Sequence, residues 1–234
     1  NMTILKNINK FRILLLIAAI GLGLAFYPPE SKAEEKDKVI MNIIYQVLRA
    51  NHFSPQELDD NFSDKAYDLF LENLDYSKRF LIEEDRQLLE QYRMLIDDQI
   101  RRSDLTFFNE AYAIYQERYH AVKTFYKDIL AQPFDLEKDE NLETDDEKKD
   151  YAANMADLQD RWRKYLKYRV LLRMDEMIMD HEKDSSTTGT EMNLLEMEQK
   201  ARAKELETHE DWFKALDDLE RIDWISAYMN AITA

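Results

Sequence analysis

The side chains most capable of chemistry in this 234-residue chain are its four histidines and its many carboxylates. The histidines are His52, His120, His181 and His209. The pair His209-Glu210 begins like a zinc-binding helix, but the second histidine that such a helix needs four residues later is missing. Aspartate and glutamate number 48, so carboxylate pairs at helical spacing arise by chance and do not indicate general acid and base catalysis. Local spacing therefore predicts no catalytic or metal-binding residue, and a zinc site built from distant histidines stays open.

Two serines have a lysine close by, in Ser77-Lys78 and Ser63-Asp64-Lys65. A serine activated by a neighbouring base can attack a carbonyl group. The resulting oxyanion needs positioned donors, often backbone N–H groups in glycine-rich turns. Beyond residue 33 the chain has one glycine, Gly189, so neither serine has such a surround. Both segments are predicted to be helix caps or turns, and the shortage of glycine argues against a β-rich or self-contained hydrolase fold.

An acidic segment, residues 135–150, contains nine acids and three lysines and almost no apolar side chains. A calcium-binding loop starting at Asp135 would place Glu140 where the sharp turn requires glycine, and Asp146 where the last ligand is glutamate. The segment is therefore predicted to be a solvated loop between helices. We expect this chain to use no metal ion or other cofactor.

The net charge of −16 limits the partners of this protein. Residues 1–33 hold four bases and one acid, which leaves 28 bases against 47 acids, a net charge of −19, in the rest of the chain. Such a field repels phosphate backbones and anionic lipids, so the sequence predicts no nucleic-acid partner. One basic run is predicted to be a solvated helix flank, with contact to a ligand as a second interpretation: Arg161, Arg163, Lys164 and Lys167.

Residues 1–33 are predicted to be a secretory signal peptide. Three basic residues precede the apolar run 13–26, and Ser31 and Ala33 place small residues at the −3 and −1 positions of a cut after Ala33. The run is fourteen residues long, whereas a spanning helix needs about 20, so an uncleaved N-terminal anchor is the alternative. The protein is expected in the periplasm, attached to the inner membrane if the signal stays uncleaved. Cysteine is absent, which excludes disulfides and a lipid anchor on cysteine.

Apolar side chains recur every three or four residues through most of the remainder, which predicts an all-α, multi-helix domain with two long helices and several short ones. The long helices are expected at Leu105–Gln132, ended by Pro133, and at Tyr151–Asp184. The segment Leu74–Leu81 breaks the periodicity. Shorter helices are predicted at Lys38–Ala50, from Ser54-Pro55, from Ser63 and at Ile82–Arg101. The helical pattern of the partner of the second long helix continues from Leu194 to Met229.

Aromatic residues and methionines are predicted to form the core, in preference to an exposed apolar groove. The buried face expected in the first long helix consists of Phe108, Tyr112, Tyr115, Tyr119, Val122, Tyr126 and Ile129. The apolar positions expected to pack near the end of the chain are Leu194, Leu195, Met197, Ala201, Leu206, Trp212, Phe213, Leu216, Leu219, Ile222, Trp224, Ile225, Tyr228 and Met229.

Four segments occur in a specific order along the chain. They are Phe53-Ser54-Pro55, then Leu74-Asp75-Tyr76-Ser77-Lys78-Arg79-Phe80-Leu81, then Trp162-Arg163-Lys164-Tyr165-Leu166-Lys167, and finally Asp223-Trp224 followed by Tyr228-Met229-Asn230-Ala231-Ile232-Thr233. In this order they resemble the N-terminal domain of tail-specific proteases, also called carboxy-terminal processing peptidases. The resemblance extends from about residue 38 to the last residue. It implies that the segment 74–81 is a structural junction.

The resemblance implies an exported serine endopeptidase that cuts proteins near their C-termini and joins a helical domain to a PDZ domain and a catalytic domain with a Ser–Lys dyad. Residues 34–234 are then the helical N-terminal domain, and the chain is expected to end before the other two domains. No position here matches the dyad, so no catalytic, cofactor-binding or metal-binding residue is carried over. The implied partners are the PDZ and protease domains of the same protein, substrates with unstructured C-termini, and a periplasmic adaptor protein.

Two other functions stay open on the sequence. The first is a free-standing periplasmic helical adaptor or chaperone-like binding protein, which needs the same charged helices over an aromatic core. The second is a metalloenzyme on a four-helix scaffold, which would carry paired Glu-x-x-His motifs that the sequence lacks.

Overall fold

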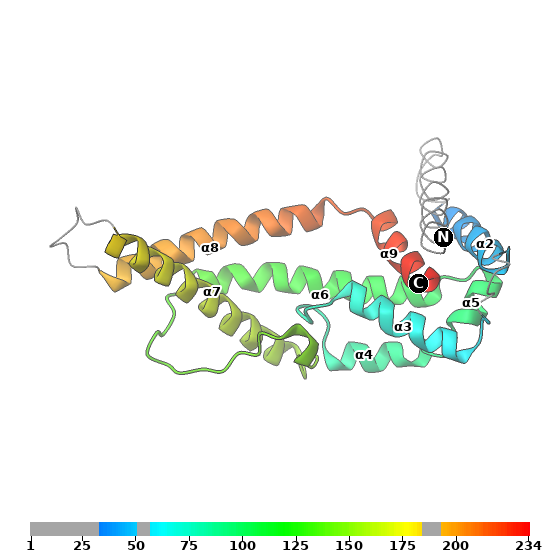
Figure 1. The fold of residues 1–234 in the computed structure, drawn as a ribbon, viewed down its shortest axis with the longest axis horizontal. Coiled ribbons are helices and arrows are strands. Elements are labelled where there is room, and N and C mark those ends of the chain that lie inside the picture. The colour runs from blue at the N-terminus through cyan, green and yellow to red at the C-terminus, as the bar shows by residue number, and fades with distance from the viewer. Residues whose placement is uncertain (1–32, 51–56, 184–192) are drawn as a thin grey trace, which may run out of the picture. The chain divides into compact units, whose positions relative to one another are not determined.

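The computed structural model describes residues 33–50, 57–183 and 193–234. Residues 1–32 of the predicted signal segment, the predicted cap at Ser54-Pro55 and Gly189 lie outside these residues. The chain forms two compact units, one of residues 1–55 with 99–105, the other of residues 56–98 with 106–234. The regular structure of the described part is entirely helical, with eight α-helices, and an isolated β-bridge joins Ile82 to Ala152. The all-α prediction is therefore confirmed (Figure 1).

The first unit contains α2, Ala33–Ala50. This helix begins five residues before the predicted start at Lys38 and ends where the prediction placed its end. None of the helices in the described ranges has a stretch long and apolar enough to span a membrane.

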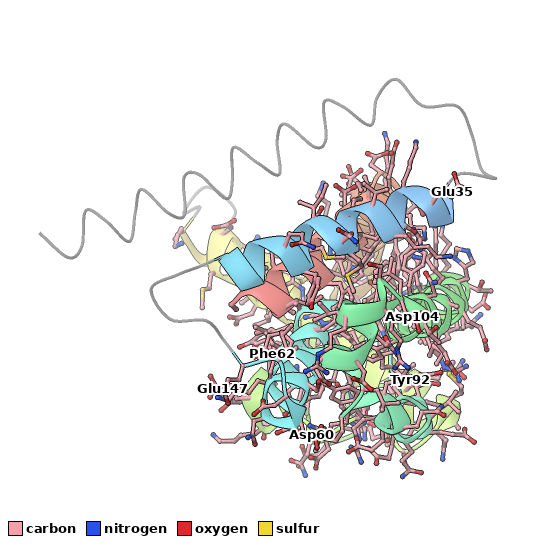
Figure 2. The ribbon with its side chains drawn as sticks, turned by 90° about the vertical axis from the view of Figure 1, so that its right-hand side faces the viewer. Glu35, Asp60, Phe62, Tyr92, Asp104 and Glu147 are labelled. Carbon is pink, nitrogen blue, oxygen red and sulfur yellow. The ribbon has the colours of Figure 1, made fainter. Side chains whose placement is uncertain are left out.

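In the second unit, helix α3 runs Asp60–Leu74, so the predicted start at Ser63 was wrong. The cap is Asp59, whose Oδ1 accepts a hydrogen bond from the Phe62 N–H at 2.9 Å. Figure 2 shows the side chains of Asp60 and Phe62 in this first turn. Ser63 lies one turn inside the helix and is buried, where its hydroxyl donates to Asp97 Oδ1 at 2.8 Å and accepts from the Asp97 N–H at 2.9 Å. A serine that sequence alone assigns to a cap is therefore a tertiary contact.

The helix predicted over Ile82–Arg101 is interrupted. It consists of α4, Glu83–Leu89, the 3₁₀ turn η1, Glu90–Tyr92, and α5, Ile96–Arg102. Between η1 and α5 the backbone forms hydrogen bonds of the 3₁₀ type, three residues apart. The Arg93 N–H donates to the Glu90 carbonyl, and the Leu95 N–H donates to the Tyr92 carbonyl. The Ser63 hydroxyl of α3 accepts a hydrogen bond from the Asp97 N–H in the first turn of α5. This contact with α3 therefore fixes the start of α5.

Four longer helices complete this unit: α6, Thr106–Leu130; α7, Met155–Lys183; α8, Leu194–Asp217; and α9, Arg221–Thr233. The two long helices were predicted to within a few residues. Helix α6 packs against α7, α8, α4 and α9, and it runs lengthwise among them in Figure 1. Asp223 separates α9 from α8, because its carboxylate accepts the Glu220 N–H at 2.8 Å in a capping box.

One aromatic cluster joins α3, α6 and α9. The Phe70 ring lies 5.6 Å from Phe107 and 4.9 Å from Tyr228, both edge to face, and the Phe108 ring stacks on Tyr228 at 5.7 Å. All four side chains have no measurable exposure. Edge-to-face and offset pairs of this kind add about 0.5–1.5 kcal/mol each to the burial of the rings.

A second aromatic cluster joins the Leu74–Leu81 segment to α6, α7 and α8. Phe80 lies 5.1 Å from Tyr115 and stacks on Trp212 at 6.0 Å. Phe213 stacks on Tyr126 at 4.5 Å and on Trp162 at 6.3 Å. The prediction that aromatic residues form the core is confirmed for these positions.

Several predicted core positions of α8 and α9 are exposed. Leu194 and Leu195 are 57% and 76% exposed, and Leu219 and Ile222 are 41% and 40% exposed. The inward face of α8 instead carries polar groups, since Glu198, Glu205 and His209 are buried. On α6, Tyr112 and Ile129 are half-buried, while Phe107, Ala111 and Leu130 are buried.

We expect the substitution Phe70→Ala to lower the free energy of unfolding by about 3–5 kcal/mol, because it empties the centre of the first aromatic cluster. Urea denaturation followed by circular dichroism measures the change. Tyr76→Ala is the control, since Tyr76 is 51% exposed, and its change should stay within about 0.5 kcal/mol. Equal effects of the two substitutions would contradict the packing described here.

Candidate functional site

The turn between α3 and α4 is organised by the carboxylate of Asp75. Its oxygens accept the backbone N–H groups of Arg79 at 2.9 Å, Phe80 at 2.9 Å and Leu81 at 2.8 Å. Burial raises the pKa of Asp75, and the three N–H donors act in the opposite direction. Lys78 has a positive φ of 48°, a conformation that costs a residue with a side chain about 1 kcal/mol or more. The structural junction expected at residues 74–81 is therefore a tightly bonded turn.

The acidic segment 135–150 is bonded to this turn, although it was predicted to be a solvated loop. Ser77 Oγ donates to Asp146 at 3.1 Å, and Lys78 Nζ donates to the Lys149 carbonyl. The segment has a short 3₁₀ turn, η2, Asp146–Lys148, and is otherwise irregular. The prediction of a loop is confirmed, and most of its residues are exposed, but Glu140, Asp146 and Lys149 are half-buried by partners outside the segment.

Glu140 is the most firmly held residue of the acidic segment. Its carboxylate accepts hydrogen bonds from Arg163 at 3.0 Å and Lys167 at 3.1 Å, and its side chain is 8% exposed. The Arg163 guanidinium, followed by Lys138 and Lys167, holds the pKa of Glu140 well below its usual range. The basic run on α7 was predicted to be a solvated flank, and this was wrong for Arg163 and Lys167, which bind an acid distant in sequence.

A buried ion cluster lies between α7 and α8. The Glu205 carboxylate has no measurable exposure and accepts hydrogen bonds from Arg169 at 3.1 Å and from Arg173. His209 Nδ1 lies 3.2 Å from the same carboxylate. Burial raises the pKa of Glu205, but hydrogen bonds from His209, Arg173 and Arg169 outweigh it and hold this pKa at about 2. Sequence spacing missed the cluster, since the arginines and the glutamate are on different helices.

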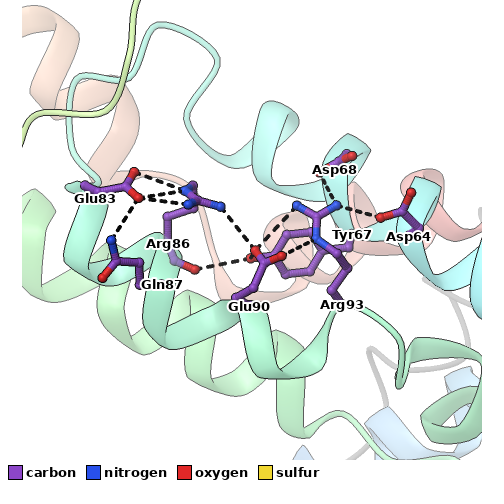
Figure 3. A network of polar contacts seen from close by, with 8 residues as sticks. All are labelled: Asp64, Tyr67, Asp68, Glu83, Arg86, Gln87, Glu90 and Arg93. Atoms are coloured by element: carbon purple, nitrogen blue, oxygen red, sulfur yellow. Dashed lines mark hydrogen bonds and ion pairs between the residues drawn. The ribbon is translucent and has the colours of Figure 1, made fainter.

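A network of ion pairs links α4 and η1 to α3 (Figure 3). Arg86 bonds Glu83 at 2.8 Å and Glu90 at 3.2 Å, and Arg93 bonds Glu90 at 2.7 Å. Arg93 also reaches Asp64 and Asp68 on α3, at 2.7 and 2.8 Å, and lies over the Tyr67 ring at 4.3 Å. Exposed pairs such as these contribute about 0–1 kcal/mol each, so the network orients the helices more than it stabilises them.

Two clefts lie beside the Asp75 turn. The first, here named the Arg93 cleft, has a volume of about 360 Å³, and its lining includes Tyr67, Asp75, Lys78, Arg93 and Tyr151. Burial raises the pKa of Tyr151 to about 12, so its phenol is neutral at physiological pH. The second, named the Arg79 cleft, has a volume of about 520 Å³, and its lining includes Lys78, Arg79, Trp162, Tyr165 and Tyr168. Both volumes fall in the range of small-ligand sites.

The residues singled out for chemistry in the sequence do not come together. His52 lies outside the described residues. His120 is exposed beside Tyr119, His181 is half-buried near the end of α7, and His209 faces Glu205. Over residues 33–50, 57–183 and 193–234, no group of three or more histidine or acidic side chains is arranged to hold a metal ion.

The two serines near lysines are each engaged in structural bonds. Ser77 bonds Asp146 while Lys78 bonds a backbone carbonyl of the acidic segment. Ser63 is bonded to Asp97, and its neighbour Asp64 pairs with Arg93. The fold and these contacts define a helical, charge-covered domain, and the two clefts beside the Asp75 turn include arginine, lysine and tyrosine in their linings.

Comparison with known proteins identifies the family. A family model described as the tail specific protease N-terminal domain matches residues 44–234. The chain belongs to this family. Among curated proteins it is similar to a tail-specific protease of Haemophilus influenzae, at 28% identity over 116 residues. That match covers 49% of this chain and 17% of the relative, so the relative is much longer than the matched domain.

We expect Asp75→Ala to lower the free energy of unfolding by about 3 kcal/mol or more, because two buried N–H groups and one partly buried N–H group lose their acceptor. Asp75→Asn keeps one acceptor oxygen and should cost less. Urea denaturation at neutral pH measures both changes. The control is Glu72→Ala on the same helix, whose exposed side chain should change stability by less than about 0.5 kcal/mol. An Asp75→Ala variant as stable as the control would show that the turn does not depend on this carboxylate.

The pKa of Glu205 predicts a pH dependence of stability. Its folded-state pKa of about 2 lies below its ordinary value of 4.5, so its contribution is present above pH 4.5 and is lost as the pH falls towards 2. We expect the loss to amount to roughly 2–3 kcal/mol. The stability difference between the native chain and Glu205→Gln, measured by chemical denaturation, should therefore shrink across this window.

The matched control for this pH experiment is Glu207→Gln, two residues further along α8. Glu207 is 62% exposed and pairs with Lys204, so its removal should change stability by less than about 1 kcal/mol. A Glu205→Gln difference that stays constant from pH 5 to pH 2 would contradict the assigned role of the buried cluster.

Proposed function

We propose that this chain is the helical N-terminal domain of an exported tail-specific serine endopeptidase. In this proposal it packs on a PDZ domain and a protease domain of the same polypeptide and helps unfolded substrate tails, or an adaptor protein, to reach them. The observation that carries the proposal is the family match over residues 44–234. The similar protein of Haemophilus influenzae, named a tail-specific protease, supports the enzyme class.

The domain's part in this enzyme is structural and not chemical. No residue of this chain matches a Ser–Lys dyad, so the nucleophilic serine and the lysine that acts as its base are assigned to the protease domain. Packing against other domains is supported by exposed apolar side chains such as Leu88 and Met94, which are 50% and 47% exposed. Access of substrate is supported by the two clefts beside the Asp75 turn.

Export rests on residues 1–33 alone, with the apolar run 13–26 and the small residues before the expected cut. Cell fractionation and N-terminal sequencing of the mature protein test this part. A mature chain that begins at Glu34 and is found in the periplasm would support it. A chain that keeps residues 1–33 and is found with the inner membrane would support the uncleaved anchor instead.

The proposed enzyme class is tested by assaying a peptide substrate with an unstructured C-terminal tail. We expect no cleavage by the purified 234-residue chain and cleavage by the longer polypeptide that includes it. Measurable cleavage by the chain alone would overturn the assignment of the catalytic residues to a separate protease domain. No cleavage by the longer polypeptide would overturn the enzyme class. The gene sequence after Ala234 also discriminates, because an immediate stop codon would favour a free-standing adaptor or chaperone-like protein.

A further inference from the structure

Arg79 is half-buried and forms no close ion pair among the described residues, although its charge acts on the carboxylates of Asp75 and Asp146. The other two arginines that line the Arg79 cleft are paired, Arg161 with Asp157 at 2.9 Å and Arg169 with Glu205 at 3.1 Å. Partial burial removes some of the water that would solvate a guanidinium, so an anionic partner is favoured at this position.

The acids nearest to Arg79 are already committed to other groups. Asp75 accepts three backbone N–H groups of its own turn. Asp146 bonds Ser77 and Lys149. Neither carboxylate therefore supplies the two oxygens that a guanidinium binds best.

Arg79 is held by one side-chain contact and two backbone hydrogen bonds. Its guanidinium carbon lies over the Tyr165 ring, 4.5 Å from the ring centroid. Its backbone N–H is bonded by Asp75, and its carbonyl accepts the Trp162 indole N–H at 2.7 Å. An arginine ordered before its ligand arrives loses little side-chain entropy on binding, which favours affinity.

The rest of the cleft combines positive charge with apolar surface. Seven basic residues and four acidic residues line it, although the chain as a whole carries a net charge of −16. The lining also includes Tyr168, which is 40% exposed, and Leu142, which is half-buried. A ligand with one carboxylate and apolar side chains is complementary to this surface.

The charge of the whole molecule narrows the chemistry of the ligand. A polyanion such as a nucleic acid, or a strongly acidic peptide, would be repelled by the surrounding field. A single carboxylate meets only the local charges, because salt screens charges beyond roughly 8 Å under physiological conditions. The observations therefore favour one carboxylate on an otherwise uncharged peptide.

We propose that the Arg79 cleft binds the carboxylate of an extended peptide, with the carboxylate on the Arg79 guanidinium and an apolar side chain against Tyr168. The carboxylate is either the peptide's C-terminal group or an acidic side chain. This inference gives a ligand chemistry to the substrate-access role proposed above and rests on that proposal for its biological meaning. The binding itself is a property of this chain and is tested without proteolysis.

The test measures the fluorescence anisotropy of three labelled peptides with the 234-residue chain. The first is uncharged in its side chains and ends in a free carboxylate. The second is the same peptide with an amidated end, and the third is amidated with one internal glutamate. We expect the first or the third to bind and the amidated, uncharged peptide to bind at least about tenfold more weakly.

The responses of the first and third peptides separate the two sources of the carboxylate. Binding of the first alone assigns the site to chain ends, binding of the third alone assigns it to acidic side chains, and binding of both assigns it to carboxylates in general. Equal affinity for the amidated, uncharged peptide, or no binding of any peptide, would overturn the proposal.

The residue assignment is tested with variants. Arg79→Gln should weaken carboxylate binding by about tenfold or more. Arg79→Lys keeps the charge but cannot form two parallel hydrogen bonds to a carboxylate, so its affinity should lie between those of Arg79→Gln and the native chain. The control is Lys204→Gln on α8, which does not line the cleft, is 56% exposed and pairs with Glu207 at 2.6 Å, and it should change affinity by less than about fivefold. Thermal unfolding of each variant shows that it is folded.

Unchanged binding by a folded Arg79→Gln variant would overturn the assignment. This result is distinguishable from failure of the proposed function. If the longer polypeptide has no protease activity, peptide binding to this chain is still measurable. If the cleft binds no carboxylate, cleavage of the substrate by the longer polypeptide would still support the enzyme class.

Discussion

The buried carboxylate of Asp75 is the contact on which the second unit's architecture depends. By accepting three successive backbone N–H groups it turns the chain sharply at the end of α3 and fixes the direction in which Phe80 enters the core. Phe80 then packs against Tyr115 of α6 and Trp212 of α8, and the Arg79 carbonyl accepts a hydrogen bond from the Trp162 indole N–H of α7. One side chain thus connects the turn to three helices, because an unpaired N–H in this interior would be costly.

Charged groups inside the helical packing have a different role from the aromatic clusters. The rings around α6 supply apolar burial, the dominant favourable contribution to folding. Glu205 with its two arginines, and Glu140 with Arg163 and Lys167, gain less in net stability because burying their charges carries a desolvation cost. Their value is specificity, since each acid has its donors only in one alignment of α7 with α8 or with the acidic segment.

The same turn links architecture to function. The domain belongs to a protease family, yet its described residues form ion pairs, aromatic clusters and clefts instead of a catalytic constellation. The surface beside the Asp75 turn presents the Arg79 guanidinium over the Tyr165 ring. The backbone around Arg79 is fixed by hydrogen bonds to Asp75 and Trp162, and the proposed carboxylate site rests on this support.

The sequence by itself determined the helical class, the two long helices and the break at residues 74–81, because periodicity, proline and scarce glycine are local signals. It also indicated the family through segments kept in order. Only the tertiary structure decided that Ser63 is buried on Asp97, that α4 and α5 are separate, and that Arg163 and Lys167 bind Glu140. The same holds for Arg79, which lies over the Tyr165 ring and forms no close ion pair among the described residues. These features depend on pairings between residues far apart in sequence. The residues next to a charged or hydroxyl side chain do not indicate which distant residue it will bind when it is buried.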